Sequence, residues 1–218
     1  MGNHSILNSD AVNISAEDTW QALVVPNLPD GIAVAEIHLS ELLNKTERLD
    51  IILPLTEVLA PSGLVQETLA LIGNRTSKIG LWADTSTTTD QLDSLLGLIT
   101  GSNSSTDTKK DTADENHISL LRALDLIVLY TPLFADGRNF SLAKHLRLQG
   151  YQGEIRVAGE FGRDQIAYLR RSGIDSFVIA NEYLAADIAT AFSVLPTAYS
   201  GNDANQLPMF RSAPASRP

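Results

Sequence analysis

A continuous apolar run at residues 124–131 is the feature that most constrains how this chain can fold. Its sequence, LDLIVLYT, is rich in branched side chains and is followed by a polar turn and a helical pattern. A run of this kind is typical of a strand covered on both faces, as in a parallel sheet. Parallel neighbours need crossover connections, so the run predicts an α/β protein.

The segments after this run continue the alternation of helix and strand. Apolar spacing predicts a helix at residues 140–149, a strand at 154–159, a helix that begins near Asp164 and ends at 170–173, and a strand at 175–180. The connections between them are short, which predicts parallel strands joined by right-handed crossovers. Residues 124–180 are therefore the expected core of the domain.

A similar rhythm precedes the core. Strands are expected at residues 31–37, 49–53 and 78–83, and helices at 62–72 and 89–99. The predicted fold is α/β: a single domain with a mostly parallel sheet of about six strands flanked by helices. The sheet is either doubly wound or an incomplete TIM-like barrel, because the pattern does not show whether it closes.

Composition divides the chain further. Residues 1–17 are polar, which predicts a flexible N-terminus, and the α/β domain is expected at 18–196. Within it, residues 101–117 are polar and of low complexity, which predicts a surface-loop insertion. This loop either has no binding role or binds a ligand. Residues 197–218 have no periodicity, so we expect an irregular C-terminal tail.

Two polar turns follow strands of the expected core. The first contains Asp136, Gly137 and Arg138, and the second lies at residues 160–164. Ligands of α/β sheets bind outside the carboxyl ends of the strands, where both turns should lie. Arg138 and Arg163 would there hold an anionic ligand or an acidic partner surface. Alternatively, Asp136 and Arg138 form only a structural turn and ion pair.

The candidate site draws on further polar residues of the core. Asp136 is the candidate acid or base. The candidates for binding an anion or a partner are Arg138, Ser141, Arg147, Arg156, Arg163, Asp164 and Gln165. Residues 136–173 hold seven basic and four acidic side chains, an excess of three positive charges in a chain of net charge −10. A basic region on an acidic protein indicates a local site for an anion or a partner.

Composition also excludes several classes of function. The net charge of −10 disfavours nucleic acid as a partner. The chain has no cysteine, so it can hold no thiol nucleophile, thiolate metal site or Cys-ligated iron–sulfur cluster. The four histidines are far apart, which predicts no metal site. No glycine-rich dinucleotide or phosphate motif is present, so the sequence implies no particular cofactor.

The sequence also bears on location. It contains no run of 18 apolar residues, so no membrane contact is expected. Residues 1–18 lack a basic region followed by an apolar segment, so no signal peptide is evident. We therefore expect a cytoplasmic protein.

Three motifs of the core resemble a bacterial family. They read FADGRNFSLAKHLR at residues 134–147, YQGEIRVAG at 151–159 and RDQIAYLRRSGID at 163–175. Together they resemble DUF934, a family whose members are labelled as oxidoreductases of sulfite reduction. The resemblance is strong over residues 124–180 and extends weakly over about 18–211. The family commonly has glycine where Asn139 stands and a Phe-Pro pair where this chain has Tyr130-Thr131-Pro132.

The resemblance implies a place in assimilatory sulfite or sulfate reduction, and three hypotheses follow. The first is an accessory protein that binds an anion, sulfite reductase or an electron carrier through the basic surface around the DGR and RDQ motifs. The second is a stand-alone enzyme that acts on an anionic substrate with Asp136 as acid or base. The third is a non-catalytic structural subunit. The sequence does not show whether the chain is an enzyme, nor its oligomeric state.

Overall fold

The structure is a computed structural model of the 218-residue chain. It describes residues 4–23, 34–35, 50–60, 68, 78–84, 86–97, 119–181 and 188–193. The predicted surface loop at 101–117 and the predicted tail at 197–218 lie outside the described residues.

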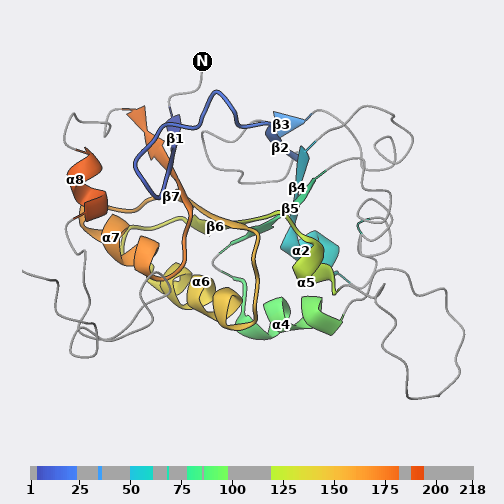
Figure 1. The fold of residues 1–218 in the computed structure, drawn as a ribbon. Coiled ribbons are helices and arrows are strands. Elements are labelled where there is room, and N and C mark those ends of the chain that lie inside the picture. Colours follow the sequence, from blue (N-terminus) through green and yellow to red (C-terminus); the bar gives the residue numbers. More distant parts are fainter. Residues whose placement is uncertain are drawn as a thin grey trace, which may run out of the picture.

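One sheet of eight strands organises the described part of the chain (Figure 1). The strands are β1 His4–Asn8, β2 Trp20–Leu23, β3 Val34–Ala35, β4 Asp50–Pro54, β5 Ile79–Ala83, β6 Leu126–Thr131, β7 Glu154–Gly159 and β8 Ser176–Ala180. Their order across the sheet is β1-β8-β7-β6-β5-β4-β2-β3. All neighbouring pairs are parallel except β1 and β8, which are antiparallel. The predicted mostly parallel α/β sheet is confirmed.

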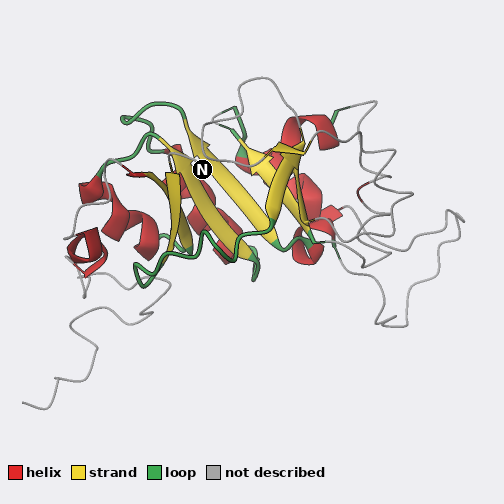
Figure 2. Cartoon of the chain, turned by 90° about the horizontal axis from the view of Figure 1, so that it is seen from above, coloured by secondary structure: helices red, strands yellow, loops and turns green. Residues whose placement is uncertain are grey.

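Six described helices pack on one side of the sheet. They are α2 Leu55–Val58, α4 Thr89–Gly97, α5 Leu120–Ala123, α6 Arg138–Leu148, α7 Arg163–Arg171 and α8 Ile188–Ser193. All six contribute side chains to one apolar cluster against the sheet, the helix-side cluster. A doubly wound sheet would carry helices on both faces. The sheet instead forms a curled half-barrel, and within the described residues it does not close into a full TIM-like barrel (Figure 2).

The strands are buried on both faces. In β6, Ile127 and Leu129 belong to the helix-side cluster, whereas Leu126 and Val128 belong to a second cluster on the other face. Successive side chains of a strand point to opposite faces, so a strand covered on both sides is apolar at most positions. This double burial explains the continuous apolar run at residues 124–131.

The face away from the helices is crossed by residues 9–19, which we call the N-terminal strap (Figure 1). The strap leaves β1 at one end of the sheet and enters β2 close to the other end. Ile14 packs on the second cluster, which we call the strap-side cluster. The backbone N–H of Ile6 donates to the Ser15 hydroxyl at 2.8 Å. The strap therefore covers the open side of the half-barrel.

Strand β1 lies within the segment for which the sequence predicted only a flexible N-terminus. Ile6 and Leu7 are buried, and the register pairs Ile6 with Val178. Two consecutive apolar residues are too few to show a strand period. The partner strand lies at the other end of the chain, so only the folded structure reveals the pairing.

Gly159 at the end of β7 offers a test of the backbone at this edge of the sheet. Its φ is +101°, and a Cβ there would lie 2.2 Å from the carbonyl oxygen of Thr131. We expect Gly159→Ala to lower the free energy of unfolding by about 2 kcal/mol, measured by urea denaturation. The matched control is Gly97→Ala at the end of α4, where a Cβ meets nothing within 4 Å. Equal effects of the two substitutions would contradict this assignment of strain.

Candidate functional site

The turns after β6 and β7 lie side by side at the carboxyl edge of the sheet. β6 and β7 are parallel neighbours, with Thr131 opposite Gly159 at their ends. Residues 133–138 follow β6, and residues 160–165 follow β7. We call these two segments together the rim. They contain five of the eight candidate residues: Asp136, Arg138, Arg163, Asp164 and Gln165.

In the first turn, Asp136 and Arg138 are joined by two hydrogen bonds. The backbone N–H and the side-chain Nε–H of Arg138 both donate to Oδ1 of Asp136, each at 3.1 Å. The Asp136 side chain is 10% exposed, whereas that of Arg138 is 62% exposed. The carboxylate therefore sits at the positive N-terminal end of α6, where it stabilises the helix. The Arg138 side chain remains mostly exposed while it makes these bonds.

Gln165 connects the second turn to the first. Its Oε1 accepts a hydrogen bond from the backbone N–H of Gly162 at 3.2 Å, at the beginning of α7. Its Nε2 donates to the carbonyl oxygen of Phe134 at 3.1 Å. Arg163 and Asp164 are exposed beside it. Gln165 thus holds the two turns in a fixed relation to each other.

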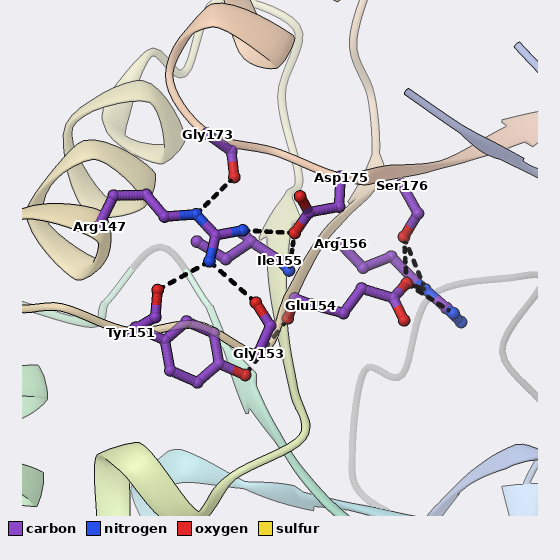
Figure 3. Close-up of polar contacts among 9 residues, drawn as sticks. All are labelled: Arg147, Tyr151, Gly153, Glu154, Ile155, Arg156, Gly173, Asp175 and Ser176. Carbon is purple, nitrogen blue, oxygen red and sulfur yellow. Dashed lines mark hydrogen bonds and ion pairs between the residues drawn. The ribbon is translucent and has the colours of Figure 1, made fainter. Parts of the chain in front are cut away.

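Arg147 lies at the opposite, amino edge of the sheet (Figure 3). Its Nε donates to the carbonyl oxygen of Gly173 at 3.0 Å, and one terminal nitrogen donates to those of Tyr151 and Gly153, each at 2.9 Å. The other terminal nitrogen pairs with the carboxylate of Asp175. Arg147 therefore joins the end of α6 to the segments that lead into β7 and β8. These internal contacts engage its guanidinium, so an incoming anion would have to displace them.

The Tyr151 ring is buried within the same structural cluster. Its hydroxyl donates to the carbonyl oxygen of Glu154 at 3.3 Å. Burial raises the pKa of the Tyr151 phenol well above its ordinary value. The phenol therefore stays protonated, as its donor role requires.

Arg156 is buried under the N-terminal strap. It pairs in register with Val128, which belongs to the strap-side cluster. Its guanidinium donates to Asp18 at 2.7 Å. It also donates to Glu154 at 2.9 and 3.0 Å and to the Ser176 hydroxyl at 3.1 Å (Figure 3). Burial works against the charge, but the hydrogen bonds and fields of Asp18 and Glu154 outweigh it and raise the pKa of Arg156.

Residues 106–210 match the family described as a bacterial protein of unknown function (DUF934). The chain belongs to this family. The matched segment contains the whole rim and the strands and helices from α5 to α8. No curated protein and no solved structure matches the chain. The DUF934 assignment therefore identifies the family without naming a reaction.

The structure divides the candidate residues of this DUF934 protein into two groups. The rim holds five of them, and Ser141 is exposed one turn into α6. Arg147 and Arg156 lie elsewhere, within internal networks. The positive excess of residues 136–173 is therefore not gathered at the rim, where Arg138 and Arg163 are accompanied by Asp136, Glu160 and Asp164. Sequence spacing could not show this separation, because it does not reveal which arginines pair internally.

Two rim residues were not among the sequence candidates. The side chains of Leu133 and Phe134 are 68% and 54% exposed. The sequence signal was a pair of large apolar residues in a turn, outside any helix or strand period. Both side chains lie outside the core clusters. An exposed apolar pair of this kind is typical of a surface that a binding partner covers.

The two departures from the DUF934 pattern lie against each other. Asn139 and Thr131 are both buried, and the Asn139 amide nitrogen lies 2.5 Å from the Thr131 hydroxyl. Oδ1 of Asn139 has no hydrogen-bond partner. A buried polar pair therefore joins the end of β6 to the first turn of α6.

The described residues hold neither a metal-ligand cluster nor a membrane-spanning helix. No group of three or more His, Asp or Glu side chains there is placed to hold a metal ion. None of the helices in those segments is long and apolar enough to cross a membrane.

Proposed function

We propose that this DUF934 protein is an accessory factor of assimilatory sulfite reduction that binds its partner or ligand through the rim. The assignment to this pathway rests on the resemblance to the DUF934 family, whose members carry a sulfite-reduction label. The binding role rests on one observation: the Arg138 side chain is 62% exposed, whereas the Asp136 side chain beside it is 10% exposed. The rim thus presents the cation of this pair outward. Sulfite reductase and its electron carrier are the expected partners.

The geometry favours binding over acid–base chemistry at Asp136. A general base needs access to the proton that it removes. The Asp136 carboxylate is largely buried, and its Oδ1 already accepts two hydrogen bonds from Arg138. A structural role at the N-terminal end of α6 explains both facts. The stand-alone enzyme with Asp136 as acid or base therefore has weaker support. The structural-subunit hypothesis accounts for Arg147 and Arg156 but not for the exposed rim.

Complementation of a deletion strain tests the rim. We expect a double Arg138→Ala, Arg163→Ala variant to slow growth on sulfate severalfold at normal protein abundance, because about 1 kcal/mol of binding is lost with each charge. A matched control replaces two exposed basic residues of helices away from the rim, Arg122→Ala and Lys144→Ala. Growth rate and immunoblot are the readouts. Wild-type growth of the double variant would show that Arg138 and Arg163 are not needed, which would contradict their proposed role in binding.

A further inference from the structure

We propose that the rim binds a protein through an apolar tip, Leu133 and Phe134, and that Arg138 orients this partner rather than holding a small anion. The inference rests on the proposed function for the pathway in which the partner works. It goes further by naming the anchor and the chemistry of the partner surface.

Exposure singles out this tip. In the part of the chain that the structure describes, five large apolar side chains are exposed: Val12, Leu133, Phe134, Leu148 and Tyr168. Of these, only Leu133 and Phe134 are adjacent in sequence. Apolar and aromatic side chains that become buried supply most of the binding free energy of a protein interface. The two side chains together form the natural anchor of such a contact.

The tip is held in place before any partner arrives. The backbone N–H of Asp136 donates to the carbonyl oxygen of Leu133 at 2.9 Å, and Gln165 holds the carbonyl oxygen of Phe134. The Phe134 ring lies so close to Gly162 that a Cβ there would be 2.5 Å from Cε2. Both turns therefore fix the tip, and little conformational entropy is lost when it is covered.

The charges around the tip define the partner surface. Arg138 is the exposed charge of the first turn, because Asp136 is largely buried. On the second turn, Glu160, Arg163 and Asp164 are all exposed. A complementary protein presents an apolar pocket, with a carboxylate on the side of the first turn and mixed charges on the side of the second.

The same charges argue against a small anion as the main ligand. The positive end of α6 is already occupied by the Asp136 carboxylate, so an oxyanion there would meet a negative charge. Glu160 and Asp164 add further negative charge to the rim. An anion gains nothing from Leu133 and Phe134, whereas a protein surface uses the whole rim.

Photocrosslinking in cells tests the tip directly. The probe is p-benzoylphenylalanine in place of Leu133, in a deletion strain that grows on sulfate. The matched control carries the same probe in place of Leu148, an exposed leucine at the end of α6. We expect an adduct from position 133 with one defined protein, identified by mass spectrometry, and at least about tenfold less adduct from position 148.

Two substitutions in the probe-bearing chain examine the chemistry of the contact. Phe134→Ala is expected to reduce the adduct about tenfold, and Arg138→Glu severalfold. Because Phe134 touches Gly162, thermal unfolding checks that the variant is folded. A second variant keeps an aromatic ring at position 134: it places the probe there and replaces Leu133, whose side chain is more exposed, with Ser.

Every outcome decides the inference. Equal adducts from positions 133 and 148, or an adduct only with a second copy of this chain, would overturn it. So would an adduct that survives Phe134→Ala and Leu133→Ser unchanged. Failure of the proposed function can be distinguished from failure of this inference. A defined partner from another pathway would support the apolar tip as the anchor and would contradict only the role in sulfite reduction.

Discussion

Replacing Arg147 by alanine is expected to lower the free energy of unfolding by about 3–5 kcal/mol, because a mostly buried guanidinium that donates several hydrogen bonds is lost. The guanidinium donates to three backbone carbonyls and to Asp175, and so joins the end of α6 to the starts of β7 and β8. Without it, these carbonyls lose their charged donor. Urea denaturation followed by circular dichroism measures the loss.

Two further variants separate this explanation from a general loss of charge. Arg147→Lys should recover only part of the stability, because an ammonium group cannot reach several fixed acceptors as the planar guanidinium does. Arg138→Ala removes an exposed cation and should cost less than about 1 kcal/mol. If Arg147→Ala were as mild as Arg138→Ala, the structural assignment of Arg147 would be wrong.

Replacing Arg156 by alanine should have the second large effect, also about 3–5 kcal/mol. Arg156 is buried, and its removal leaves Glu154 and Asp18 facing each other without a cation. Because Asp18 belongs to the N-terminal strap, the strap should also loosen. Limited proteolysis should then cleave within residues 9–19 faster than in the wild-type protein.

A compensating variant tests the cause of this effect. Adding Asp18→Asn and Glu154→Gln to Arg156→Ala removes the unpaired charges, so part of the lost stability should return. If the triple variant is no more stable than Arg156→Ala, the loss comes from packing rather than from charge. Proteolysis of the strap in the same variants shows whether the strap and the ion cluster are coupled.

The central part of the fold could be predicted from local patterns. Residues 126–129 are apolar at every position because both faces of β6 are buried, and that pattern is visible without a structure. The turns after β6 and β7 meet because parallel strands place their carboxyl ends at one edge. These features depend on neighbouring segments, so sequence order carries the information.

Features that depend on distant segments could not be predicted. β1 pairs with β8 across most of the chain, and its polar surroundings resemble a loop. The position of all described helices on one side of the sheet follows from how the sheet curls, which no local period encodes. The same limit applies to the site, because one internal partner of Arg156, Asp18, lies in the distant strap.

Growth of a strain that lacks this gene tests the proposed pathway most directly. The strain is supplied with sulfate, sulfite, sulfide or cysteine as its sole sulfur source. A protein of sulfite reduction should be needed on sulfate and sulfite and dispensable on sulfide and cysteine, with growth restored by the wild-type gene. Normal growth on all four sources would contradict the proposed role in sulfite reduction.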